Sequence, residues 1–244
     1  MADRHRLAGV DAVTALGPLP TPGREPDVLD ARELYRFFRS GDEETRALRG
    51  VTLGVGRGET VAVVGPSGSG KSTLLACLAG LDEPAGGAVY VDGVRISHRP
   101  EAERARLRAR RIGVLLQSGN LLAHLDVTAN IRLARAAAPG RPAERVGELL
   151  DRVGLDRRAR ALPRELSGGE LARAGLAVAL ANAPDVLLAD EPTGELDGHS
   201  EARILDLLRT EARTGRAVLI VTHSPAALRI ADRTIELRDG RIRE

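Results

Sequence analysis

Lysine is almost absent from this sequence of 244 residues. Lys71 is the only lysine, and every other member of the 36 lysine and arginine residues is an arginine. Lysine carries a compact ammonium, whereas arginine carries a wide, planar guanidinium. The exception at Lys71 therefore indicates a site that needs the compact cation, with chance retention as the alternative.

Aromatic residues are scarce as well, at 2% of the chain, and tryptophan is absent. Because 43% of the residues are still hydrophobic, the chain can bury a sizeable core, built from Leu, Val, Ile and Ala. Three of the four aromatic residues, Tyr35, Phe37 and Phe38, lie close together ahead of the first expected strand. Taken by itself, this clustering is explained by ordinary packing.

Three further absences exclude classes of protein. The single cysteine, Cys77, rules out an intramolecular disulfide and fits a reducing compartment. No apolar run approaches the roughly 20 residues of a membrane-spanning helix, and the N-terminus lacks the apolar core of a signal peptide. The net charge of +2, without a basic block, gives no case for a nucleic-acid partner.

What the sequence does contain is an alternation of apolar strands and helices. It predicts an α/β fold whose mainly parallel sheet is covered on both faces. The expected helices are 71–79, 101–111, 143–153, 168–180 and 200–213, and the expected sheet strands are 60–65, 112–116, 186–190 and 217–222, with a closing hairpin over 234–242.

Two subdivisions are expected beside this sheet. A strand at 51–55 and a hairpin at Asp92-Gly93, which joins 88–91 to 94–96, predict a small N-terminal antiparallel sheet. The segment from about 117 to 166 has helical patterns and no strand, so it predicts an inserted helical lobe that continues into the helix 167–181. Residues 1–28, rich in proline and glycine, are expected to be a flexible extension of a domain that spans 29–244.

The clearest chemical motif lies between a buried strand and a helix. It runs Gly65, Pro66, Ser67, Gly68, Ser69, Gly70, Lys71 and Ser72, which is a phosphate-loop pattern in its required context. Glycines let successive backbone N–H groups converge on one anion, and the helix N-terminus adds partial positive charge. Lys71 would reach the β- and γ-phosphates of a nucleotide, and the Ser72 hydroxyl would ligate Mg²⁺. The alternative is an ordinary glycine-rich turn.

Two acids, Asp190 and Glu191, end the apolar strand 186–190. The carboxyl edge of a parallel sheet is where α/β proteins place their ligands. Asp190 there suits Mg²⁺ coordination, and Glu191 could polarise an attacking water next to the γ-phosphate. Without a phosphate loop upstream, two acids that simply begin a surface loop would be the better interpretation.

Several further motifs resemble those of ABC (ATP-binding cassette) ATPases, from about Leu34 to the C-terminus. The stretch Leu166, Ser167, Gly168, Gly169 and Glu170 resembles the family's signature sequence; Gln117 resembles its Q-loop glutamine, Asp197 the end of its D-loop and His223 its switch histidine. Among ABC ATPases, the chain looks most similar to the macrolide-export and lipoprotein-release group.

The resemblance implies an ATPase subunit with ATP and Mg²⁺ as cofactors and with Glu191, His223 and Lys71 as catalytic residues. The implied ATP contacts are Phe38 stacked on adenine, residues Gly65 to Ser72, Thr73 and Gln117; the implied Mg²⁺ ligands are Ser72, Gln117 and Asp190. Ser167 to Glu170 would contact the ATP of a partner chain in a head-to-tail dimer of two copies or of homologous subunits. An integral membrane permease subunit would complete the complex, which places the chain at the inner face of the cell membrane.

Some positions depart from the family pattern, and alternatives remain. Phe38 stands where the family usually has Tyr, Glu195 replaces a small or amide residue in the D-loop, and Leu171 and Ala172 replace a polar pair after the signature. Ser167 alone could be an ordinary helix cap. The alternative functions are a soluble ABC ATPase of an assembly or remodelling complex and a phosphate-loop kinase.

Overall fold

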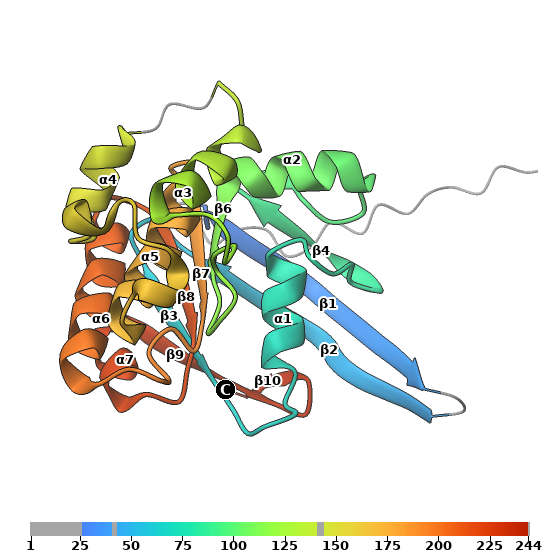
Figure 1. Ribbon diagram of the computed structural model, residues 1–244. Helices are drawn as coiled ribbons and strands as arrows, with labels where there is room; N and C mark the ends of the chain where they lie inside the picture. The colour runs from blue at the N-terminus through green and yellow to red at the C-terminus, as the bar shows by residue number, and fades with distance from the viewer. Residues whose placement is uncertain (1–25, 41–42, 141–143, 244) are drawn as a thin grey trace, which may run out of the picture.

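A computed structural model of the chain describes residues 26–40, 43–140 and 144–243. Within them, β1 (Leu29–Ser40), β2 (Glu43–Val55), β4 (Gly86–Val91) and β5 (Val94–Arg95) form an antiparallel sheet in the order β2-β1-β4-β5. The long β1–β2 pair extends away from the body of the molecule (Figure 1). The predicted N-terminal antiparallel sheet is confirmed.

A second sheet, in the order β10-β9-β3-β8-β7-β6, is parallel except for β10 at its edge. Its strands are β3 (Thr60–Val64), β6 (Ile112–Leu115), β7 (Val186–Asp190), β8 (Ala217–Val221), β9 (Arg233–Arg238) and β10 (Arg241–Arg243). Helices cover both faces of this sheet (Figure 1). One face packs against α1 (Lys71–Leu78) and α2 (Glu101–Arg111), and the other packs against α5 (Gly168–Leu180), α6 (Gly198–Arg213) and α7 (Pro225–Ile230). The predicted α/β class is confirmed.

The continuous apolar runs of the central strands follow from this double coverage. On β7, Leu188 belongs to the hydrophobic cluster that includes α1, whereas its neighbours Leu187 and Ala189 belong to the cluster that includes α5 and α6. Successive side chains of a strand point to opposite faces, so a strand buried on both faces has no polar side. Each fully buried Leu contributes roughly 1.5–3 kcal/mol to folding.

Helices fill the segment between β6 and β7, and no strand occurs in its described residues. They are α3 (Val127–Ala136), α4 (Val146–Arg152) and two short 3-10 turns, Asp156–Arg158 and Pro163–Glu165. Sequence analysis did not locate α3, and residue 143, where it expected a helix to begin, lies outside the described residues.

The helical segment is tied to the sheet by a buried carboxylate. Glu211 of α6 is 1% exposed, and its carboxylate pairs with Arg152 of α4 and with Arg216 before β8.

At the N-terminal side, one expectation was wrong and another was correct but incomplete. The aromatic cluster does not precede the first strand but lies on β1, and the expected strand 51–55 is only the end of the longer β2. The alternation on β1 is broken at Arg32 and Glu33, both exposed, where Glu33 has a positive φ of 49° and the pairing register shifts. Such a bulge hides the period of two from which a strand is predicted.

The start of the packed chain also differs from the expectation. Residues 1–25 of the expected extension lie outside the described residues, but Val28 is 2% exposed and its N–H donates to the Val55 carbonyl at 2.9 Å. Packing therefore begins before Leu29. No helix in the described part of the chain is both long and apolar enough to cross a membrane.

Candidate active site

The loop between β3 and α1 has a backbone that only glycine allows at two positions. Gly65 has φ of 154° and Gly70 has φ of 103°. A Cβ at Gly65 would lie 2.0 Å from the Leu237 carbonyl oxygen, and one at Gly70 would lie 2.3 Å from the Ala47 carbonyl oxygen. The two glycines therefore let the loop pass close to the neighbouring backbone and turn directly into the N-terminus of α1, which carries unpaired N–H groups and partial positive charge.

Two polar groups of this loop are left with hydrogen-bonding capacity. The Lys71 ammonium donates to the carbonyls of Gly65 at 2.7 Å and Pro66 at 3.0 Å, which uses two of its three N–H donors. Ser69 is 3% exposed, and its hydroxyl has no partner among the described residues. Buried polar groups are nearly always satisfied, so the site fits an anion better than an empty turn.

Glu191 follows β7 in a strained backbone conformation. Its φ is 44°, which is uncommon for a residue with a side chain, and its N–H is held by the Val221 carbonyl at 2.9 Å. The carboxylate accepts the His223 backbone N–H at 3.2 Å, and its other oxygen lies 3.3 Å from His223 Nε2. Strain of this kind persists where the surroundings enforce it, and here it aims the carboxylate at the histidine loop.

Asp190, the last residue of β7, has a raised pKa. Burial is the main cause and the neighbouring charge of Glu191 adds to it, while Lys71 acts in the opposite direction. The carboxylate is therefore under-compensated by protein cations. A divalent cation would offset both causes.

These elements meet in one cavity of about 460 Å³. It is lined by Phe38, Thr45, Arg46, Ala47, Ser67, Gly68, Gly70, Lys71, Ser72, Thr73, Gln117, Asp190, Glu191, Val221 and His223. The phosphate loop, the two acids, the glutamine and the histidine come from distant parts of the sequence and share this space. Thr45 and Arg46 of β2 were missed by sequence analysis because no motif marks them.

The three clustered aromatic residues do not face the same way. Phe38 lines the cavity, opposite Thr45 on β2, and is 43% exposed. The rings of Tyr35 and Phe37 lie against each other, with centroids 6.4 Å apart. Of the three, only Phe38 lines the cavity that holds the phosphate loop.

The signature stretch lies apart from this cavity. Ser167 caps α5: its hydroxyl accepts the Glu170 N–H at 3.2 Å, and the Glu170 carboxylate accepts the Ser167 N–H at 2.9 Å. Arg158 also donates to Glu170, and it is the main cause of the lowered pKa of that carboxyl. The helix-cap alternative thus describes the local structure. In the described chain, Ser167, Gly168, Gly169 and Glu170 do not line the cavity of Lys71.

Gln117 lines both the cavity of Lys71 and a second cavity of about 220 Å³. Gly168 and Glu195 also line this second cavity. The Gln117 side-chain Nε2 donates to the Glu195 carboxylate at 3.3 Å. A carboxylate can only accept, so this contact fixes the amide nitrogen and leaves the amide oxygen for a cation. Asp197 caps α6 by accepting the His199 and Ser200 N–H groups, and these hydrogen bonds lower its pKa.

A second group of residues that sequence analysis missed connects the acidic loop to the histidine loop. Glu201 of α6 accepts from the Ser224 hydroxyl at 2.5 Å and from the Thr193 hydroxyl at 3.2 Å. Thr193 follows Glu191 closely, and Ser224 follows His223. No sequence signal could have revealed this link, because it joins three separate segments.

Comparison with known proteins agrees with this geometry. The family model described as ABC transporter matches residues 48–194. The chain belongs to the ABC transporter family. It carries the ATP-binding cassette of that family. It is 42% identical over 222 residues to the lipoprotein-releasing system ATP-binding protein LolD 1 of Caulobacter vibrioides, which covers 88% of this chain and 94% of that relative.

Other relatives of the chain are longer. The macrolide export ATP-binding/permease protein MacB of a Shewanella species is 41% identical over 217 residues, which cover 87% of this chain but 33% of that relative. The chain thus spans about a third of the length of MacB. Among solved structures, the dimeric ABC transporter cassette MJ0796 matches with a TM-score of 0.81 and 34% identity, over 88% of this chain and 97% of that one. A post-hydrolysis dimer of the same cassette, bound to ADP and Pi, also has a TM-score of 0.81, with 33% identity.

Proposed function

We propose that this chain hydrolyses ATP to ADP and phosphate as one half of a head-to-tail dimer and thereby drives a separate membrane subunit. The observation that carries the proposal is the cavity that brings the phosphate loop together with Asp190, Glu191, Gln117 and His223. The post-hydrolysis state of a structural relative supports the same reaction.

The residues of the cavity take separate parts in this proposal. The N–H groups of the phosphate loop and the free donor of Lys71 bind the β- and γ-phosphates, while Phe38 stacks on adenine. Glu191 accepts a proton from the attacking water, and His223, which lies 3.3 Å from that carboxylate, orients it and contacts the γ-phosphate.

Ser72, Gln117 and Asp190 would hold Mg²⁺. A hydroxyl, an amide oxygen and a carboxylate form the oxygen-donor set that Mg²⁺ prefers, and all three residues line the cavity. When bound, the ion neutralises charge on the transferring phosphoryl group. Asp190 is the charged member of this set of three, and burial together with the neighbouring charge of Glu191 raises its pKa.

The second half of each site would come from a second copy or a homologous ATPase subunit. Ser167, Gly168 and Gly169 open a helix N-terminus that can bind an anion, yet they do not line the cavity of Lys71 in the described chain. A head-to-tail partner would bring them over the γ-phosphate. The dimeric cassettes among the structural relatives support this arrangement.

The membrane subunit would dock beside Gln117. A largely apolar groove of about 620 Å³ is lined by residues 119–122, by one face of α3 and by Val178, and in it Leu122 is 46% and Leu133 is 50% exposed. Exposed leucines in a groove are typical of a docking site for a partner segment. We therefore infer a peripheral position on the cytoplasmic face of the membrane. The relatives' names, macrolide export and lipoprotein release, favour outward transport.

Lys71 provides the direct test. Lys71→Ala should weaken equilibrium binding of MgATP and abolish phosphate release, and Lys71→Arg should fail as well, because the guanidinium is wider and planar. The measurements are a nucleotide titration and a phosphate-release assay. Wild-type binding and hydrolysis by Lys71→Arg would contradict the requirement for a compact cation, and no hydrolysis by the wild-type protein with its membrane partner would contradict the proposed function.

A further inference from the structure

We propose that Arg36, held by Asp82, is a positioning residue that fixes the ring of Phe38 as the base-binding wall of the cavity. The inference rests on the proposed function, because it takes Lys71 and its loop as the phosphate end of the same site.

Arg36 covers one side of the Phe38 ring. The guanidinium carbon lies 4.7 Å from the ring centroid, which is a cation–π contact. This contact places the two side chains on the same side of β1. Phe38 lines the cavity and Arg36 is not among the lining residues, so the ring stands between the guanidinium and the space that a nucleotide would fill.

Asp82 fixes the guanidinium in turn. Arg36 Nε and Nη2 donate to the two carboxylate oxygens of Asp82, both at 2.8 Å, and each side chain is only about a quarter exposed, at 26% and 27%. A bidentate pair of this kind fixes orientation as well as distance. Without it, Arg36 could adopt many rotamers, and the Phe38 ring, which is 43% exposed, would lose its fixed contact with the guanidinium.

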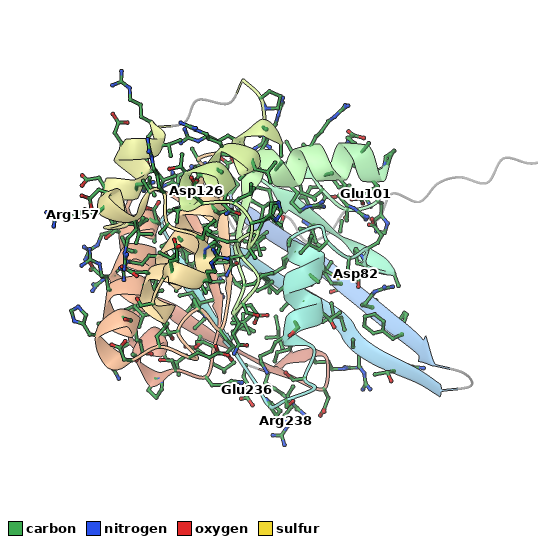
Figure 2. All side chains as sticks on the ribbon, viewed as in Figure 1. Asp82, Glu101, Asp126, Arg157, Glu236 and Arg238 are labelled. Carbon is green, nitrogen blue, oxygen red and sulfur yellow. The ribbon has the colours of Figure 1, made fainter. Side chains whose placement is uncertain are left out.

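The position of Asp82 connects this pair to the phosphate loop. Asp82 follows α1, the helix that begins at Lys71, and its N–H donates to the Ala76 carbonyl at 3.1 Å. In Figure 2 the label of Asp82 stands beside α1, next to β1. The pair therefore ties the strand that carries Phe38 to the helix whose start carries Lys71, and it fixes the base-binding wall relative to the phosphate-binding end.

The same strand offers a matched control. Arg32 lies over the Tyr90 ring at 4.8 Å and pairs with Asp30 at 2.7 Å, but neither Arg32 nor Tyr90 lines the cavity. Arg32→Met removes the same kind of contact from β1 as Arg36→Met does. An effect specific to Arg36 therefore cannot arise from a general loss of a cation–π contact or of one positive charge.

The test is equilibrium binding of two probes, MgATP and magnesium tripolyphosphate, which lacks the base and ribose. Arg36→Met and Asp82→Asn should weaken MgATP binding about two- to five-fold, the range of an exposed cation–π contact, and leave tripolyphosphate binding unchanged. Arg32→Met should change neither. In a Phe38→Leu background, Arg36→Met should have no further effect, because the ring that it positions is gone.

Two results would overturn the proposal: unchanged MgATP binding in Arg36→Met while Phe38→Leu weakens it, or an equal loss for both probes. The second would show a disturbed phosphate loop rather than a displaced ring, and a thermal melt of each variant identifies misfolding. Failure of the proposed function is a separate result, namely MgATP binding that does not depend on Lys71.

Discussion

Replacement of Glu191 by glutamine is expected to stop hydrolysis and to leave nucleotide binding intact. The carboxylate touches His223 at two points, 3.2 Å to the backbone N–H and 3.3 Å to Nε2. A glutamine can keep the first of these contacts through its amide oxygen, so the loop geometry should survive. It cannot take a proton from water, and loss of a general base typically lowers the rate by about 10²–10⁴-fold.

Uncleaved ATP should then hold two chains together. In the described chain Ser167 and Lys71 do not line the same cavity, so one ATP that contacts both must lie between two copies. Light scattering on Glu191→Gln should show a dimer with MgATP and mainly monomer with MgADP, because ADP lacks the γ-phosphate that the signature helix would bind. If closure requires the proposed membrane subunit, the dimer should appear when the same measurement is made with that subunit present.

A second substitution tests whether the N-terminus of α5 forms the dimer contact. Adding Ser167→Arg should abolish the dimer, since a bulky side chain would block the N-terminus of α5, while ATP binding to the monomer should persist. Asp126→Arg is the matched control, because Asp126, labelled in Figure 2, caps α3 as Ser167 caps α5. Each variant loses a helix cap worth about 1 kcal/mol. A monomer in saturating MgATP, or a dimer that survives Ser167→Arg, would refute the reasoning.

Three further outcomes follow from the same geometry. Phe38→Ala should reduce ATP affinity by about 1–3 kcal/mol in a titration, by analogy with base–aromatic stacking, and Phe38→Tyr should be nearly neutral; equal affinity in Phe38→Ala would favour a packing role. The raised pKa of Asp190 means that the folded, nucleotide-free protein binds this proton more tightly than the unfolded chain, so the group costs stability as pH rises above its ordinary value of 3.8. Asp190→Asn should therefore raise the Tm of the nucleotide-free protein at neutral pH and remove the Mg²⁺ dependence of ATP binding; an unchanged or lower Tm would contradict the electrostatic reasoning. Glu211→Gln should lower the free energy of unfolding by about 3 kcal/mol in a urea titration, because it leaves Arg152 and Arg216 without their buried carboxylate. A loss below about 1 kcal/mol would show that these two ion pairs are not important for stability.

The fold was predictable where sequence periodicity and burial agree. Strands β3, β6, β7 and β8 are buried on both faces, so their apolar runs marked them within a residue or two. The long β1–β2 pair was not predictable to the same extent, because bulges at Glu33 and Gly50 break the alternation that identifies a strand. Helix α6 begins at Gly198, ahead of the expected start at 200, because the Asp197 cap lies directly before it.

The sequence by itself determined the phosphate loop, because its chemistry is local. Glycine spacing, the strand before it, the helix after it and the sole lysine lie in one short stretch, and backbone conformation follows from neighbouring residues. The tertiary structure alone decided that Phe38, and not Tyr35, faces that loop, that Glu191 is turned toward His223, and that Arg36 reaches Asp82. Those relations depend on strand register and on contacts across many residues, which packing sets and no local pattern records.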